Sequence, residues 1–138
     1  MKKGRRYEET GFIEGQHEPG SRRRVLRNLL GIKKKREIER VELREQVRAT
    51  EEFIDTYSPD HRFTSDDIRR IHRIWFAPVY AWAGEYRKVN MTKGGFTFSA
   101  AGQIPRLMAS FEKNLLRKFT PCRGKSTEEI VQALAVVH

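Results

Sequence analysis

Residues 74–98 constrain the fold of this chain more than any other stretch. They include both tryptophans, which with Phe76, Tyr80 and Tyr86 place five of the fourteen aromatic residues within twelve positions. A helical pattern enters this stretch and stops at Pro78, because proline lacks a backbone N–H and disfavours helix in the residue before it. Aromatic side chains dominate core burial, so we expect the core to form around this point of the chain.

Two short strand-like runs follow the aromatic cluster. A corner at residues 82–84 leads into residues 86–91 and 96–98, which are predicted as strands. The connection between them contains Gly94 and Gly95, and glycine tolerates the positive φ that a tight turn needs. The remaining sequence is predicted to be helical. The expected fold class is therefore mainly α, a helical bundle with one β-hairpin.

The composition fits one small domain with a heavily charged surface. The chain has 138 residues, of which 38% are hydrophobic and 33% charged, and its net charge is +10. Residues 1–40 contain thirteen Lys and Arg against six Asp and Glu, so most of the positive charge lies there. Such a segment attracts nucleic acid, anionic lipid or an acidic protein, or it is only a solvated surface. The single cysteine, Cys122, excludes an internal disulfide and a cysteine-rich zinc site.

Neither a signal peptide nor a membrane span is predicted. The basic start of the chain is followed by Tyr7, Glu8 and Glu9 instead of an apolar stretch. The longest uncharged apolar run, residues 74–83, is about half the length that a span requires and contains a proline. We expect a soluble, cytoplasmic protein without a membrane partner.

Helical periodicity and capping residues divide the chain into segments. Residues 1–20 are predicted as a polar N-terminal segment, 21–57 as N-terminal helices and 58–138 as the core of the domain. Five helices are predicted. They run from after Ser21 to before Gly31, from near Arg36 to near Tyr57, from after Thr64 to before Pro78, from near Ile104 to Phe119, and from after Ser126 to the end of the chain. The positions expected to face inward in the second and last helices are Ile38, Val41, Val47, Ile54, Tyr57, Ile130, Leu134 and Val137.

Two stretches of the sequence resemble a known family. They are IRRIHRIWFAPVYAWAGEYRKVNMTKGGFTFSAAGQIPRLM and the later helix that ends in ALAVVH. In both, the chain resembles the Fic (Fic/Doc, Fido) family. The resemblance covers residues 21–138 and is most specific at 71–98. It implies a Fic-type helical bundle that transfers a nucleoside monophosphate, usually AMP from ATP, to a protein hydroxyl (AMPylation). It also implies Mg²⁺ as a cofactor of the intact domain.

The signature of the family, His-x-Phe-x-(Asp/Glu)-Gly-Asn-Gly-Arg, does not occur in these residues. The histidines are His17, His61, His72 and His138, and none of them begins such a motif. The missing residues are the base, the metal-binding carboxylate and the glycine-rich phosphate turn. We therefore expect a Fic domain truncated before the signature, with no catalytic residue, no metal ligand and no tight ATP or Mg²⁺ binding. His72 is interpreted as a structural histidine and not as a ligand.

The family uses its hairpin as a flap that aligns a target protein by strand addition. The resemblance implies that the flap residues face the target or lie near the nucleotide. The alternative is a hairpin that only covers the core. The flap candidates are Val89, Asn90, Met91, Gly94, Phe96 and Phe98.

Many Fic proteins carry an inhibitory motif, (Ser/Thr)-x-x-x-Glu-(Gly/Asn), whose glutamate pairs with an arginine of the signature. Thr10, Glu14 and Gly15 fit this pattern. Gly11 and Gly15 disfavour the helix that the motif requires, so the alternative is an ordinary polar turn.

Other functions stay open at this stage. One is a basic helical nucleic-acid-binding protein that uses residues 22–24 and 33–36. Another is a non-catalytic interaction module that binds a target protein through the flap. We also expect self-association through the apolar face of the last helix, because no later helix in these residues covers it.

Overall fold

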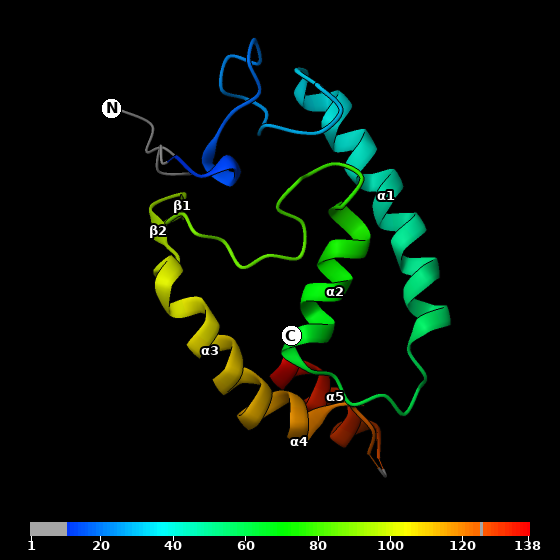
Figure 1. Ribbon diagram of the computed structural model, residues 1–138. Coiled ribbons are helices and arrows are strands. Elements are labelled where there is room, and N and C mark those ends of the chain that lie inside the picture. The colour runs from blue at the N-terminus through cyan, green and yellow to red at the C-terminus, as the bar shows by residue number, and fades with distance from the viewer. Residues whose placement is uncertain (1–10, 125) are drawn as a thin grey trace.

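The computed structural model describes residues 11–124 and 126–138, and Figure 1 shows how its helices are arranged. The helix α1 lies along one edge of the molecule with α2 beside it, and the line of α3 and α4 lies across from them. A small hairpin stands at the far end of α3, and α5 packs at the end of α4. The bounds are α1 Lys35–Thr56, α2 Ser65–Phe76, β1 Thr92–Lys93, β2 Phe96–Thr97, α3 Ile104–Phe111, α4 Arg117–Phe119 and α5 Thr127–Val137. This mainly helical fold with one hairpin confirms the predicted fold class.

Local capping chemistry sets the ends of α2. The Thr64 side chain accepts a hydrogen bond from the Asp67 N–H (3.1 Å), and the Asp67 side chain accepts one from the Thr64 N–H (2.9 Å). This reciprocal pair is the predicted capping box. The helix ends at Phe76, two residues before Pro78, as the proline predicts.

The predicted helix at residues 36–57 is α1, but only part of its predicted inner face is correct. Ile38 is buried, whereas Val47 and Ile54 are 57% and 73% exposed. The buried side of α1 packs against α2, and Val47 and Ile54 lie on the opposite side. The sequence shows which residues of α1 are apolar, but their spacing could not show which face of the helix packs against α2.

The helix predicted over residues 22–30 is wrong. Arg22 and Arg23 have left-handed backbones, with φ of 54° and 61°. Ser21 does not cap a helix, because it is buried and its Oγ donates to the Val25 carbonyl oxygen (3.3 Å). A helix this short is marginal in water, and backbone bonds to residues 16 and 18 replace it.

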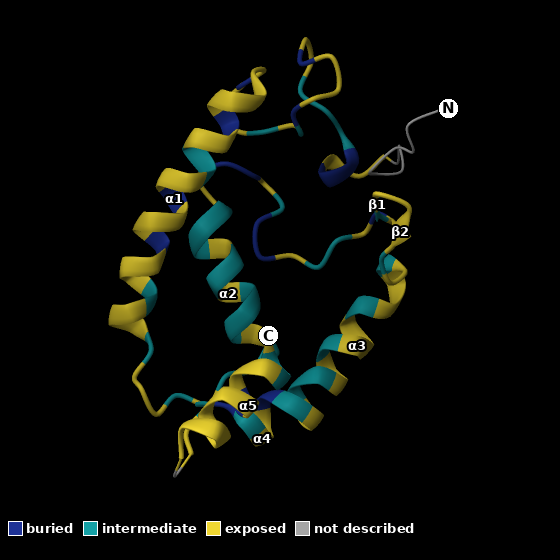
Figure 2. Ribbon diagram, turned by 180° about the vertical axis from the view of Figure 1, so that it is seen from behind, coloured by how far each residue is buried: buried dark blue, intermediate teal, exposed yellow. Residues whose placement is uncertain are grey.

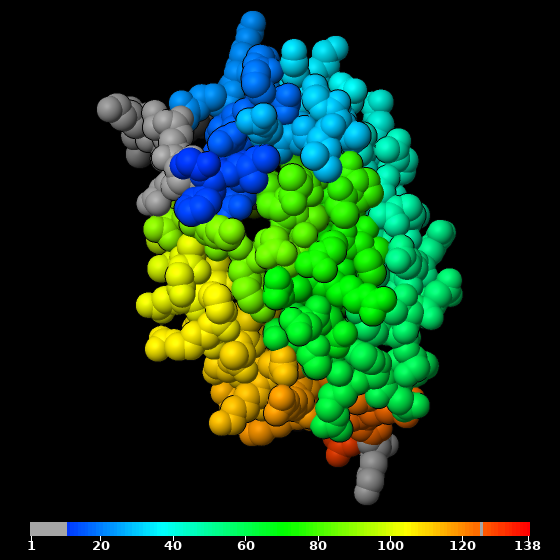
Figure 3. Space-filling view, in the orientation of Figure 1, coloured from blue at the N-terminus to red at the C-terminus, as the bar shows by residue number. Residues whose placement is uncertain are grey.

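Asn28 organises the turn that follows. Its Nδ2 donates to the carbonyl oxygens of Leu26 and Ile32, and its Oδ1 accepts from the N–H groups of Leu30 and Ile32. The Leu29 N–H donates to the Val79 carbonyl oxygen (2.8 Å), which ties this turn to the stretch after α2. Residues 11–34, which form the N-terminal segment of the described structure, are therefore fastened to the aromatic residues that follow α2, and Figure 3 shows this segment lying against them.

The core lies where the N-terminal segment, the start of α1 and the stretch after α2 meet. The buried residues of this cluster are Val25, Ile32, Ile38, Val79 and Tyr80. Glu42 fixes the aromatic side chains to α1, because its side chain accepts from the Tyr80 hydroxyl (2.6 Å) and its carbonyl oxygen from Trp75 Nε1 (3.0 Å). The predicted core region is thus confirmed.

The hairpin is shorter than predicted, and its position is shifted. Residues 86–91 are not a strand, since β1 begins at Thr92 and pairs antiparallel with β2 through Thr92↔Thr97 and Lys93↔Phe96. The turn is the two-residue pair Gly94 and Gly95, with φ of 58° and 81°. Two adjacent residues with positive φ match the right-handed twist of a hairpin, so the glycines set the register.

The helix predicted over residues 104–119 is continuous, but one π-helical turn, Glu112–Leu116, separates α3 from α4. Glu112 joins this turn to α2, since its Oε2 accepts from the N–H and Oγ of Ser65 (2.8 and 2.6 Å).

The last helix, α5, is capped by the Ser126 Oγ, which accepts from the Glu129 N–H (3.3 Å). Ile130 and Leu134 do not face inward as predicted, because they are 37% and 51% exposed and Ala133 is the buried residue. Among the described residues, no helix combines the length and apolar character needed to cross a membrane.

Candidate functional site

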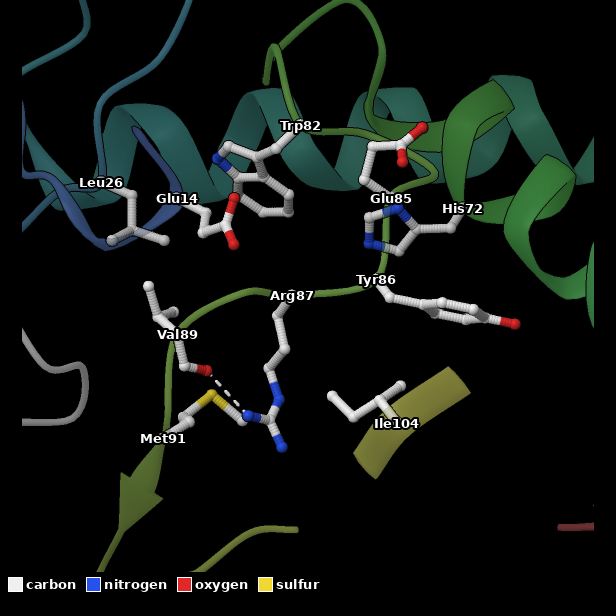
Figure 4. Close-up of a pocket in the computed structure, with 10 residues that line it drawn as sticks. All are labelled: Glu14, Leu26, His72, Trp82, Glu85, Tyr86, Arg87, Val89, Met91 and Ile104. Carbon is white, nitrogen blue, oxygen red and sulfur yellow. Dashed lines mark hydrogen bonds between the residues drawn. The ribbon is translucent and has the colours of Figure 1, made fainter. Parts of the chain in front are cut away.

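A pocket of about 300 Å³ lies between the N-terminal segment, the stretch that follows α2 and the start of α3 (Figure 4). Its lining combines apolar side chains with two carboxylates, an arginine and a histidine. The lining residues are Glu14, Leu26, His72, Trp82, Glu85, Tyr86, Arg87, Val89, Met91 and Ile104.

The corner at Trp82 to Gly84 forms one wall and is fixed to α2 on both sides of Gly84. The Gly84 N–H donates to His72 Nδ1 (2.8 Å), and the Gly84 carbonyl oxygen accepts from Arg69 Nε (3.0 Å). Gly84 has φ of +80°, and a Cβ there would lie 2.8 Å from the Arg73 Cβ. Only glycine fits this corner, because it alone combines left-handed backbone with so close an approach.

His72 has the structural role predicted for it. Its Nδ1 accepts a backbone hydrogen bond, and its ring lies 5.9 Å from the Trp82 ring. Burial lowers the pKa of His72 below its usual value, since a buried imidazolium loses hydration. The lowered pKa favours the neutral ring, in which Nδ1 accepts the Gly84 N–H.

Glu14 closes the pocket from the N-terminal segment. It belongs to a single 3₁₀ turn, Ile13–Gly15, and its side chain is buried. Its carboxylate accepts a hydrogen bond from the Lys88 N–H, on the stretch that leads to the hairpin. The Lys88 ammonium lies 5.9 Å from the centre of the Phe12 ring, which adds a second contact between the two segments.

Arg87 fastens the two ends of the hairpin region to each other. Its Nη1 donates to the Val89 carbonyl oxygen (2.7 Å), and its Nη2 donates to the Ser99 carbonyl oxygen. Asn90 adds a further bond, since its Oδ1 accepts from the Ala101 N–H (3.0 Å). These bonds hold the base of the hairpin against the start of α3.

Trp82 provides a polar atom without a partner. In the described part of the chain, its Nε1 is buried and has no hydrogen-bond partner. A buried indole N–H usually finds an acceptor, so this donor is an exception among the buried polar groups.

The six flap candidates separate into two groups. Val89 and Met91 line the pocket, and Val89 is only 1% exposed, so its side chain does not reach a target protein. Gly94 forms the turn and Phe96 is 65% exposed at the hairpin, with its ring 5.1 Å from that of Phe98. Asn90 is exposed and supports the hairpin base.

The three candidates for the inhibitory motif are only partly described. Thr10 lies outside the described residues, Glu14 is in the pocket, and Gly15 ends the 3₁₀ turn. Sequence reasoning missed Arg87 and Tyr86 as site residues, because neither belongs to a periodic segment or to a family motif. The only sequence feature that could have identified them is their position beside the aromatic corner at residues 82–84.

Carboxylates, histidines and cysteines do not gather into a metal site. Across residues 11–124 and 126–138, no three of them lie together in a way that could hold an ion.

The fold and the pocket define a helical protein in which a short hairpin and an N-terminal carboxylate meet beside one cavity. The chain belongs to the Fic/DOC family, because the model of that family matches residues 62–138, which is more than half of the chain.

The known proteins to which it is similar include two from Bartonella. Protein adenylyltransferase VbhT of Bartonella schoenbuchensis is 33% identical over 109 residues, which are 78% of this chain and 22% of VbhT. The FIC domain of Bep5, a VirB-translocated effector of Bartonella clarridgeiae, superposes with a TM-score of 0.60 at 19% identity, over 84% of this chain and 57% of that one. The chain thus spans about a fifth of the curated relative and just over half of the solved domain.

Proposed function

We propose that this chain is the target-positioning part of a Fic domain that transfers AMP from ATP to a protein hydroxyl. Membership in the Fic/DOC family supports the reaction class, as does a relative named as a protein adenylyltransferase. The intact domain uses ATP and Mg²⁺, and the signature that handles them is absent from these 138 residues.

The observation that carries this proposal is the hairpin. In the described residues, the sheet consists of β1 and β2 alone, so no third strand lies along the outer edge of either. An extended segment of a target can add to such an edge, with backbone bonds giving the register. The exposed Phe96 ring then contacts the target, and the pocket lies beside the hairpin base.

The test compares this chain with a version that carries a Fic signature segment appended in frame. Incubated with labelled ATP, Mg²⁺ and cell lysate, the 138-residue chain should label nothing above background, because base, metal ligand and phosphate turn are lost together. The extended version should label protein. Robust labelling by the repurified 138-residue chain contradicts the proposal.

Phe96 tests the flap separately. In the extended version, Phe96→Asp should lower transfer to a target about tenfold or more, because a charge replaces an apolar contact at the edge. Leu107→Asp is the matched control, since Leu107 is also exposed but lies on α3. Equal losses in both variants argue against a flap role.

Glu14 is proposed as the restraining carboxylate. In the family, the inhibitory glutamate pairs with an arginine of the signature through a charge-assisted bond. Its burial beside the pocket supports this role. In the extended version, Glu14→Gln keeps an acceptor for the Lys88 N–H but removes the charge, so transfer should rise about thirty- to a hundredfold.

Glu128→Gln is the control for that experiment. Glu128 is exposed in the first turn of α5, and the substitution changes the charge equally. If both variants match the parent, Glu14 has only the structural contact with Lys88.

A basic surface pocket supports a second candidate function, the binding of nucleic acid. The pocket has a volume of about 640 Å³ and its lining includes no acidic residue. Its cations are Arg22, Arg24, Lys33, Lys34, Lys35 and Arg36. Contacts with phosphates would make binding fall steeply with salt. Fluorescence anisotropy with a labelled duplex at several salt concentrations tests this, with Lys33→Glu/Arg36→Glu as the variant that should lose binding.

A further inference from the structure

The outer side of α1 carries an apolar stripe. Leu43, Val47 and Ile54 are 61%, 57% and 73% exposed, while Ile38 and Ala49 of the same helix are buried. The spacing of four and seven residues places the three side chains on one side of the helix, opposite the buried ones. Figure 2 shows α1 at the edge of the molecule with much of its outer surface exposed.

Four charged residues between positions 40 and 55 follow one border of this stripe, and their signs are segregated. Glu37 lies on the same border before them, and Arg48, at the edge of this border, pairs with Glu45 and Glu52 of its own helix. Arg40 and Arg44 lie in the N-terminal half of α1, and Glu51 and Asp55 lie in the C-terminal half. All four are exposed. Arg44 Nε lies 3.5 Å from the Glu45 carboxylate, and in the described part of the chain the other three make no ion pair.

We propose that the outer side of α1 pairs with the same surface of a second copy of this chain, with the two helices antiparallel. A two-fold axis near residues 47 and 48 brings Arg40 opposite Asp55 of the second copy, and Arg44 opposite Glu51. A two-fold axis at nearly the same position along α1 also brings Leu43 against Ile54 of the second copy, and Val47 against Thr50 of the second copy.

The charge order selects this orientation. An antiparallel two-fold pair places the same border of both helices together, so the basic half meets the acidic half. A parallel pair instead places opposite borders of the two helices together, so Arg40 and Arg44 do not meet Glu51 and Asp55 of the second copy. The charged border is therefore complementary to itself in the antiparallel arrangement.

The contact is small. A helix of 22 residues is about 33 Å long, and one helix pair buries less surface than a stable interface needs. We expect a weak dimer whose fraction rises with protein concentration and falls with salt, since the charged border is exposed. This inference does not depend on the proposed catalytic function.

Sedimentation equilibrium of the 138-residue chain, from about 10 µM to about 1 mM, measures the dimer. Val47→Lys places two like charges near the axis and should weaken dimerisation at least tenfold. Leu134→Lys is the control, because Leu134 is also exposed but lies on α5, the other apolar surface. All the substituted side chains are exposed, and circular dichroism checks that the variants are folded.

Charge reversal gives a second, independent test. Two double variants should each weaken the homodimer: Arg40→Glu/Arg44→Glu and Glu51→Lys/Asp55→Lys. The first makes the four charged residues of this border entirely negative and the second makes them entirely positive, so like charges meet across the pair. An equimolar mixture of the two variants should regain a dimer, now mixed. A monomeric parent throughout the concentration range overturns the proposal. A dimer that Leu134→Lys disrupts and Val47→Lys leaves intact also overturns it. The third contradicting result is a mixture of the two charge-reversal variants that fails to associate.

Discussion

At the scale of single residues, the half-buried His72 and the buried Glu14 hold the site together. His72 accepts a backbone hydrogen bond from the aromatic corner, and Glu14 accepts one from the stretch before the hairpin. Both bonds use the side chain as an acceptor. Single substitutions can separate that acceptor role from packing.

Stability should depend on pH through His72. Burial lowers its pKa in the folded protein below the ordinary value of 6.5, so the unfolded chain takes up the proton first. The free energy of unfolding should therefore fall as the pH drops below about 6.5, by at most about 1.4 kcal/mol per pH unit. Urea unfolding at pH 7.5, 6.5 and 5.5 measures this.

His72→Asn is the control, because an amide oxygen can accept the Gly84 N–H and does not titrate. Carboxylates with lowered pKa values, such as Asp67, lose their stabilising charge only at lower pH, near or below the usual value of 3.8. Burial acts to raise the pKa of Asp67, but hydrogen bonds from His61 and Thr64 outweigh it. A variant with the same slope as the parent between pH 6.5 and 5.5 would assign the effect to another group.

Glu14 should contribute to stability through the Lys88 N–H. Glu14→Ala removes the acceptor and leaves a half-buried donor unpaired, so we expect a loss of about 1–3 kcal/mol. Glu14→Gln keeps an acceptor and should cost clearly less. Denaturant unfolding of both variants at pH 7.5 decides between these outcomes, and equal losses would mean that the charge itself is required.

At the scale of elements, the aromatic corner links α2 to the hairpin through Gly84. Gly84→Ala meets both a left-handed backbone and contacts of 2.8 Å to Arg73 and 3.0 Å to the Arg69 carbonyl oxygen. We expect a loss of about 2–4 kcal/mol in the free energy of unfolding. Thermal and urea unfolding measure it.

Gly102 offers a matched control. It lies in the short turn Ala101–Gln103 before α3, and a Cβ there would have no atom within 4 Å. Gly102→Ala should change stability by less than about 1 kcal/mol. Similar losses in the two alanine variants would show that Gly84 is not a special position.

The helices could be predicted from the sequence because their signals are local. The capping box of Thr64 and Asp67 and the periodicity after Ile104 lie within a few residues of the structure that they define. The segment at residues 22–30 could not, because backbone bonds from Glu18 to Val25, from Arg27 to Gln16 and from Leu29 to Val79 determine it. These bonds join residues that no helical periodicity relates.

The candidate site was predicted only in part for the same reason. Glu14 and the hairpin residues came from the family resemblance, but the bond between Glu14 and Lys88 joins positions 74 residues apart. Sequence spacing also could not place Val89 in a buried wall and Phe96 on the surface. Both positions follow from how the hairpin base packs against α3 and the N-terminal segment.

At the scale of the whole molecule, the two ends of the described chain have different surroundings. The N-terminal segment contributes Val25 and Ile32 to the core. By contrast, α5 buries only Ala133 and exposes Ile130 and Leu134. In the proposed function, the apolar side of α5 is where the helices of an intact Fic domain pack.

Amide hydrogen exchange should therefore be uneven along the chain. A helix whose residues are mostly exposed opens locally at a low free-energy cost. We therefore expect α5 to exchange at least about tenfold faster than α2, whose residues are mostly half-buried and which is fixed by its capping box and by Glu112. Exchange followed by mass spectrometry measures both helices in one sample. In the version extended by a Fic signature segment, exchange in α5 should slow while that in α2 stays unchanged, because the added residues cover Ile130 and Leu134. Equal protection of α5 and α2 in the 138-residue chain would show that α5 is already stably packed and needs no further segment.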